Sequence, residues 1–285
     1  MQAPNHTHGP RGRAALFDLH EPWVTLCTPM SPERPLRDQH SALEAPPEGR
    51  SGGVLFEVGC ALWGFTAGWL CIQALGVLAP SWVQGGFLYA LSPIQLGIGG
   101  LVYAGIVRAM GPPVAALPVA SLRGAPPTAP PGLARAGWLW LLHSAAAIGG
   151  SIALAFVLEA LGLEVQEQAA VLEVVGDGRT WTSALMALSV GAVVLAPMAE
   201  EWMYRGLLFR RLHATTVPAV AWTVPAVLFA LSHGNPSGML VYIWLGLVFA
   251  SAYRTTGRLW IAMGVHAANN LVTLGYLIAA ARMGM

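Results

Sequence analysis

Long apolar stretches alternate with short polar or proline-rich segments from residue 53 to the end of the chain. A helix that crosses a membrane needs about 20 mainly apolar residues, because each residue adds about 1.5 Å of length. Seven stretches come close to this length, and we expect each to form a spanning helix. They cover about 54–79, 87–108, 138–161, 183–209, 217–233, 238–254 and 259–280. The pattern therefore predicts an all-α protein, a polytopic bundle of about seven transmembrane helices.

Residues 1–52 have a different character. They contain eight prolines, five arginines and six acidic residues, and no apolar run that could cross a bilayer. Such a segment cannot bury enough apolar surface to offset the entropy lost on ordering, so we expect a disordered tail. Two further parts follow from the pattern: residues 53–182 hold the N-terminal transmembrane helices and their loops, and residues 183–280 form a C-terminal core.

Composition supports the membrane interpretation. Only 10% of the residues are charged and 55% are hydrophobic, whereas soluble domains carry about 25% charged residues. The net charge of +1 excludes a nucleic-acid binder that uses a basic patch. Lysine is absent, and the composition favours a bacterial chain with a GC-rich coding sequence. We expect an integral protein of the bacterial inner membrane.

The arginines predict the orientation. If the N-terminal tail is cytoplasmic, seven spans leave only Arg179 and Arg282 on the outer side. Cytoplasmic loops of membrane proteins carry an excess of basic residues, so this distribution favours a cytoplasmic N-terminus and an outer C-terminus.

Two adjacent glutamates interrupt the apolar stretch 183–209. A charged side chain inside a membrane costs at least a few kcal/mol, so Glu200 and Glu201 should face protein or a water-filled cavity. Glu201 and Arg205 are four residues apart, lie on one helix face and can pair. Glu200 points about 100° away and stays available. The alternative is a buried ion pair with one carboxylate that reaches the membrane interface.

Two later stretches bring further polar groups. Phe229 and His233 are four residues apart near the end of one stretch, and His266 and Asn270 share a face of the last. A single histidine inside a span is more often a packed, hydrogen-bonded residue than a site. Polar groups on three separate spans favour a site.

Distances along the helices test whether these groups can meet. If the chain reverses near Thr216, Glu200 and His233 both lie about 24–26 Å from that turn. His266 lies about 14 Å beyond the turn at Thr256–Gly257. It reaches the same membrane depth as Glu200 and His233 if the hairpin that turns near Thr216 projects about 10 Å further than the one that turns at Thr256–Gly257. We therefore expect the three groups to converge in a cavity within the bilayer.

The order of these residues resembles the CPBP intramembrane proteases. That family includes the type II CAAX prenyl endopeptidases, the bacteriocin-processing proteins and bacterial sorting proteases of the myxosortase type. Its pattern is Glu-Glu-x-x-x-Arg, Phe-x-x-x-His and His-x-x-x-Asn, each on its own hydrophobic helix. Here the motifs read Glu200-Glu201-x-x-x-Arg205, Phe229-x-x-x-His233 and His266-x-x-x-Asn270. The resemblance covers residues 183–280, which it implies are a catalytic core.

The resemblance implies an intramembrane peptidase of the glutamic type. Peptide hydrolysis needs a base that activates water and donors that stabilise the oxyanion. A carboxylate in a poorly solvated cavity suits the first task, so Glu200 is the expected base and His233 helps to orient the water. By the family analogy, His266 and Asn270 stabilise the oxyanion. The expected supporting residues are Glu201, Arg205 and Phe229.

The expected partners are the lipid bilayer and a membrane-associated protein or peptide that is cleaved. C-terminal sorting tails rank first among the substrates, ahead of secreted peptide precursors and other membrane proteins. The orientation suggests that the substrate approaches from the cytoplasm.

Three other functions stay open. One is a catalytically idle immunity or scaffold protein with the family fold, against which the intact motifs argue. A zinc protease could use Glu200, His233 and His266 as ligands, but it would then lack a separate base, so we predict no cofactor. A transporter or proton relay would need a polar path across the membrane. Outside the motifs the candidates are Glu57, expected at the membrane interface, and His143, expected to be packed or interfacial.

Overall fold

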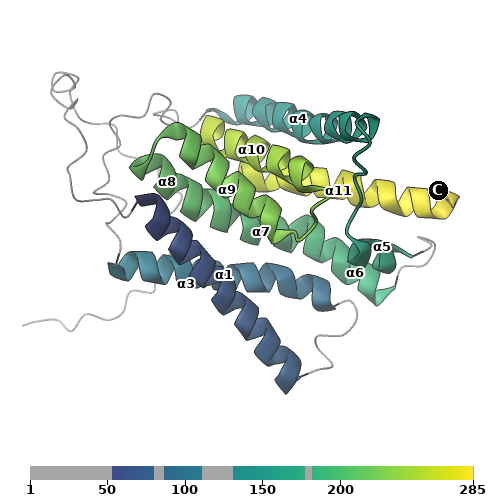
Figure 1. Ribbon diagram of the computed structural model, residues 1–285. Coiled ribbons are helices and arrows are strands. Elements are labelled where there is room, and N and C mark those ends of the chain that lie inside the picture. Colours follow the sequence, from purple (N-terminus) through teal and green to yellow (C-terminus); the bar gives the residue numbers. More distant parts are fainter. Residues whose placement is uncertain (1–52, 80–86, 111–130, 177–181, 285) are drawn as a thin grey trace, which may run out of the picture. The chain divides into compact units, whose positions relative to one another are not determined.

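The structure, a computed structural model, describes residues 53–79, 87–110, 131–176 and 182–284. Every regular element in these ranges is a helix (Figure 1). The expected tail, residues 1–52, lies outside the described residues. The N-terminal part contains α1 (Gly53–Leu78), α3 (Phe87–Met110), α4 (Leu133–Ala160) and the short α5 (Ala169–Val175).

The C-terminal part begins with one helical run, Ser183–Thr215, that changes its winding several times. Its segments are α6 (Ser183–Val190), the π-helical η3 (Gly191–Leu195), α7 (Ala196–Glu201), the π-helical η4 (Trp202–Phe209) and α8 (Arg210–Thr215). Then follow α9 (Pro218–Ser232), α10 (Met239–Thr256) and α11 (Leu259–Met283). The two π-helical segments flank α7, the segment that carries both glutamates.

The lengths of these helices confirm a polytopic membrane protein. Six helices in the described ranges are long and apolar enough to cross a membrane. The seventh expected span, α9, has 15 residues, or about 22 Å of helix. It ends early because the chain turns at Gly234, which has a φ of +61°.

Large apolar side chains face outward from the bundle, as lipid-facing positions require. Leu55, Val77 and Trp63 keep 82%, 82% and 68% of their surfaces exposed. Soluble monomers rarely expose apolar surface on this scale, so these faces fit a bilayer.

Close backbone contact joins the first two helices, which cross side by side in Figure 1. Gly64 and Gly68 of α1 lie one turn apart against α3. A Cβ atom on either would clash with a backbone carbonyl, that of Gly99 or Gln95 respectively. Small residues at a four-residue spacing allow membrane helices to approach in this way.

Glu57, expected at the membrane interface, lies inside the protein. Its side chain is almost fully buried. Arg211 Nε of α8 donates to Glu57 Oε1 at 2.8 Å, and the Tyr103 hydroxyl of α3 donates to Glu57 Oε2. The carboxylate is buried because partners from two other helices, one of them 154 positions away, satisfy it. We call Glu57, Tyr103 and Arg211 the anchor cluster, since it ties α1 and α3 to the C-terminal part.

The remaining helices position the two glutamates. α7 packs against α3 on one side and α11 on another, while α10 packs against α4, α9 and α11. Figure 1 shows α4, α10 and α11 side by side. A buried apolar cluster that includes Phe229, Phe249 and Tyr204 fills the space between these helices. Glu200 and Glu201 therefore point into a region enclosed by protein.

Candidate active site

The three sequence motifs meet around one aromatic ring. Phe229 lies with its ring centre 4.7 Å from that of His233 and 5.7 Å from that of His266. The Arg205 guanidinium lies 4.9 Å from the same ring, within the range of a cation–π contact. The expected convergence of the motifs from α7, α9 and α11 is confirmed.

Glu201 holds two of these groups. Arg205 Nη1 donates to Glu201 Oε1 at 2.9 Å, and His266 Nδ1 lies 2.9 Å from the same oxygen. Arg205 Nη2 also donates to the Gly246 carbonyl on α10 at 2.8 Å. Glu201 and Arg205 are fully buried. The expected pair between them is present, and it extends into a network that ties three helices together.

His266 presents its second ring nitrogen to Glu200. Because a carboxylate only accepts hydrogen bonds, His266 Nδ1 carries a hydrogen and donates to Glu201. His266 Nε2 lies 3.9 Å from Glu200 Oε2. Phe249 stacks on the imidazole at 4.4 Å and holds the plane of the ring.

Glu200 differs from its neighbour because its carboxylate is not tied down. The residue is 7% exposed, and its Oε2 atom has no hydrogen-bond partner. Buried carboxylate oxygens are normally satisfied, so an unsatisfied one marks a site for a water, an ion or a substrate. The geometry makes Glu200 the available carboxylate of the pair, as its position on the helix predicts.

His233 ends α9 and lines a pocket. Its Nδ1 donates to the Phe229 carbonyl at 2.7 Å, which leaves Nε2 as an acceptor. Tyr242 of α10 stacks on its ring at 4.1 Å. The His233 ring thus lies between the pocket and Phe229, whose ring also contacts His266.

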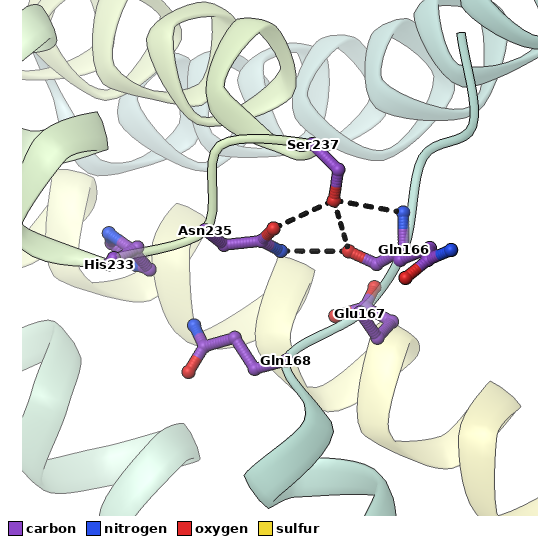
Figure 2. A pocket seen from close by; sticks show the side chains of 7 residues that line it. Gln166, Glu167, Gln168, His233, Asn235 and Ser237 are labelled. Atoms are coloured by element: carbon purple, nitrogen blue, oxygen red, sulfur yellow. Dashed lines mark hydrogen bonds between the residues drawn. The ribbon is translucent and has the colours of Figure 1, made fainter.

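The pocket has a volume of about 330 Å³. Its lining includes Gln166, Glu167, Gln168, His233, Asn235 and Ser237. In Figure 2 the backbone of Gln166 crosses close to Asn235 and Ser237. Asn235 Nδ2 donates to the Gln166 carbonyl at 2.7 Å, and Ser237 Oγ donates to the same oxygen at 3.3 Å. The connection between α4 and α5 is thereby fastened to the turn after α9.

Glu167 brings the pocket a carboxylate. Its side chain keeps contact with the surface, but the surrounding protein partly removes water from the carboxyl group and raises its pKa. Gln168 Nε2 donates to the Tyr242 hydroxyl at 3.4 Å, which connects the same segment to the ring stacked on His233. The pocket walls are therefore mainly polar.

The pocket lies at the end of α9 that is distant from α8. Described arginines gather at the α8 end: Arg210 and Arg211 on α8, Arg254 near the end of α10, and Arg258 before α11. Arg258 Nη2 also donates to the Pro131 carbonyl at the start of α4. His233 therefore lies at the opposite end of its helix from these arginines, which mark the end that the positive-inside pattern predicts to be cytoplasmic. The fifteen residues of α9 separate it from the arginine-rich end.

Asn270 and Asn269 reach different neighbours. Asn270 Nδ2 donates to the Ala192 carbonyl of η3 at 2.8 Å. Asn269 Nδ2 donates to Asn270 Oδ1 at 3.4 Å. Asn270 lies four residues after His266 on the same face of α11, as the sequence predicts, and its amide donates to the helical segment that precedes Glu200.

A metal site fits these residues poorly. Among the side chains that the structure describes, no three His, Cys, Asp or Glu residues gather in an arrangement that could hold a metal ion. We therefore derive no step through a metal.

Sequence analysis missed three features of the site. The contact between Glu201 and His266 joins residues 65 positions apart, and no local spacing indicates it. Tyr242 and Gln168 lie outside the motifs, in a helix and a connection that look ordinary in the sequence. A weak signal was present for Gln168: the segment around it is polar between two apolar stretches.

Fold and site together define a polytopic membrane protein with a buried glutamate, two histidines and a polar pocket. Residues 181–272 match the family model described as type II CAAX prenyl endopeptidase Rce1-like. This C-terminal region is therefore similar to the Rce1-like endopeptidases, and the resemblance to the CPBP proteases is confirmed. No solved structure matches the chain.

Two curated relatives support the match. "Putative membrane peptidase YdiL" of Bacillus subtilis (strain 168) is 27% identical over 119 residues, which are 42% of this chain and 45% of the relative. "Membrane-embedded CAAX protease MroQ" of Staphylococcus aureus (strain USA300) is 31% identical over 83 residues, 27% of this chain and 34% of the relative. The chain spans less than half the length of each relative in these matches.

Proposed function

We propose that this protein is an intramembrane endopeptidase that hydrolyses a peptide bond in a membrane-associated protein or peptide. One observation carries the proposal: the Glu200 carboxylate is buried, has an oxygen without a hydrogen-bond partner, and lies 3.9 Å from the His266 imidazole. The similarity to the Rce1-like endopeptidases supports the same reaction class.

The arrangement suggests how the residues divide the reaction. Glu200 takes a proton from a water molecule, and the resulting hydroxide attacks the carbonyl carbon of the scissile bond. His233 Nε2, an acceptor, orients that water from the pocket side. Glu200 then returns the proton to the amine as the carbon–nitrogen bond breaks. The products are a new carboxyl terminus and a new amino terminus.

His266 is the proposed oxyanion donor. Its Nδ1 donates to Glu201, and in the doubly protonated form of the ring Nε2 also carries a hydrogen that it can donate. A donor held in place before the reaction stabilises the developing negative charge without reorganisation. One amide hydrogen of Asn270 remains after its bond to Ala192, and we propose that it helps in the same task.

Replacement of Glu200 by Gln tests this mechanism. The purified full-length protein in lipid nanodiscs is incubated with a panel of membrane-anchored peptides, and products are identified by mass spectrometry. Glu200→Gln should abolish cleavage, whereas Glu159→Gln, at an exposed position outside the site, should leave it unchanged. Normal cleavage by Glu200→Gln contradicts the proposal.

The position of the pocket supports entry from the outer face of the membrane. The pocket lies at the end of α9 opposite the arginine-rich end, which the positive-inside rule assigns to the cytoplasm. A C-terminal sorting tail crosses the membrane once and exposes its boundary with the mature protein on the outer side. We therefore propose such tails as the preferred substrate class.

Two experiments test the entry side and the substrate. In a variant without the native cysteines, Ser237→Cys should react in intact cells with a membrane-impermeant maleimide, while Thr255→Cys, beside the arginine-rich end, should not. The opposite pattern reverses the orientation. Surface proteins should then keep uncleaved C-terminal tails in cells that carry only Glu200→Gln, and unchanged tails remove this substrate class.

The same assays decide between this function and its alternatives. A zinc protease predicts loss of cleavage on exhaustive chelation and recovery with zinc, whereas the metal-free mechanism predicts no loss. A proton relay would need free polar groups along the membrane. His143, however, has both ring nitrogens engaged, with the Leu139 carbonyl and Ser251 Oγ, and Glu57 is paired. These contacts favour the peptidase.

A further inference from the structure

A backbone carbonyl about two turns before Glu200 lacks its usual donors. In the π-helical turn η3 the Ala196 N–H donates to the Gly191 carbonyl, five residues back. An α-helix would have sent that N–H to Ala192. The next residue, Pro197, would be the five-residue donor to Ala192, but proline has no N–H. The Ala192 carbonyl therefore receives neither the four-residue nor the five-residue backbone hydrogen bond.

Asn270 supplies a donor from another helix. Its Nδ2 lies 2.8 Å from the Ala192 oxygen, and its Oδ1 accepts from Asn269 Nδ2 at 3.4 Å. Because a carbonyl in the apolar part of a membrane has no water to bond, an unsatisfied one is costly. The side-chain amide thus replaces the backbone donor that the Ala192 carbonyl loses through the winding of η3 and through Pro197.

We infer that Asn270 is a positioning residue that caps the Ala192 carbonyl, holds the π-helical turn and thereby fixes Glu200 beside His266. Glu200 lies three residues after Pro197. His266 and Asn270 are one helical turn apart on α11, and they bond Glu201 and Ala192 respectively. α11 therefore forms hydrogen bonds to the glutamate-bearing helix both before Pro197, at Ala192, and after it, at Glu201. The role of Glu200 itself rests on the proposed function, but the capping contact does not.

Capping and oxyanion stabilisation are separable roles for one amide. The bond to Ala192 uses one of the two hydrogens on Nδ2, so the other remains for a substrate. Replacing Pro197 by Ala separates the roles because it restores a backbone N–H. That N–H reaches Ala192 if the wide turn persists. If the segment rewinds as an α-helix, Ala196 donates to Ala192 instead. Either outcome makes the Asn270 cap dispensable.

Thermal unfolding of the full-length protein in nanodiscs tests the cap without any substrate. Asn270→Ala should lower Tm by about 3 °C or more, and Asn270→Asp, which keeps the shape but loses the donor, by at least as much. In the Pro197→Ala background the loss caused by Asn270→Ala should fall to less than about half. The matched control Asn269→Ala, which removes no donor to Ala192, should change Tm little. If the Tm losses caused by Asn270→Ala and Pro197→Ala simply add in the double variant, the inference is overturned.

Chemical labelling of Glu200 tests the positioning. A water-soluble carbodiimide with a small amine modifies carboxyl groups, and mass spectrometry measures the rate at each site. Asn270→Ala should change the labelling rate of Glu200 by about threefold or more through local opening, and Pro197→Ala should restore the original rate in the double variant. Fully buried Glu201 is the internal reference. An unchanged Glu200 rate in Asn270→Ala overturns positioning. If Glu200→Gln cleaved normally, the proposed function would fail while these measurements kept their meaning.

Discussion

Glu57 and Glu200 are both buried carboxylates in the membrane-spanning part, yet their surroundings differ. Each oxygen of Glu57 accepts a hydrogen bond, one from Arg211 and one from Tyr103. Glu200 Oε2 has no hydrogen-bond partner, and His266 Nε2 is 3.9 Å away. The adjacent Glu201 lies between these cases. Its Oε1 accepts two hydrogen bonds, and its Oε2 has no hydrogen-bond partner.

The contrast shows how a buried acid can serve structure or chemistry. A carboxylate whose hydrogen bonds are all made is stable where it is, and removing a partner from such a buried pair costs about 3–5 kcal/mol. A carboxylate with an open oxygen destabilises the resting protein, but it can accept a proton from water. Substitutions at the two positions should therefore affect different measurements.

The largest expected effect is on cleavage by Glu200→Gln. The amide cannot accept the proton, so the rate should fall by about 10³-fold or more. Tm in nanodiscs should stay within about 2 °C of the parent protein or rise, because an unsatisfied buried charge is removed. A large loss of stability with normal cleavage by the folded fraction would make Glu200 resemble Glu57 and remove the contrast.

Glu57→Gln should show the reverse pattern. Losing the charge that faces Arg211 should lower the free energy of unfolding by about 3 kcal/mol, while the folded fraction keeps its cleavage rate. The double variant Glu57→Leu with Arg211→Met is the control, since replacing both charged partners by apolar groups should recover much of the loss. Equal losses in the single and double variants would show that the pairing is not what stabilises the cluster.

How well the sequence predicts the contacts of these side chains depends on how far apart the partners lie along the chain. Hydrophobic stretches predict six of the spans closely because each is a local property of about 20 residues. The Glu201–Arg205 pair follows from a four-residue spacing, and the meeting of the motifs from helix length alone. The Glu57–Arg211 pair joins residues 154 positions apart, so Glu57 looked like an interfacial acid.

Two further features depend on backbone winding, which the hydrophobic pattern does not carry. The π-helical turn η3 consists of small and apolar residues, as do ordinary membrane helices, so its sequence gives no sign of the wider winding. The expected approach side took the turn near Thr216 as its reference, whereas the described pocket lies beside His233 at the far end of α9.

Glu201→Gln should combine both kinds of effect, since Glu201 lies between the two cases. The amide weakens the bonds from Arg205 and His266 and so holds the proposed oxyanion donor less firmly, and cleavage should fall on the order of 10²-fold. Tm should also fall, by less than in Glu57→Gln, because one oxygen of Glu201 already lacks a partner. Comparing both measurements in the same nanodiscs checks this order. An effect on stability alone would limit Glu201 to holding the helices.

The smallest expected effect is that of Tyr103→Phe in the anchor cluster. The substitution removes one hydroxyl donor from Glu57 and leaves the Arg211 bond in place, so it should cost about 1–2 kcal/mol of unfolding free energy. Cleavage should not change, because Tyr103 contacts neither α7 glutamate in the described hydrogen bonds. In the Glu57→Gln background the cost of Tyr103→Phe should shrink, since the hydroxyl then faces a weaker acceptor. If the cost stayed the same, the hydroxyl would act through packing, and full satisfaction of Glu57 would not explain why this acid is structural while Glu200 is available for chemistry.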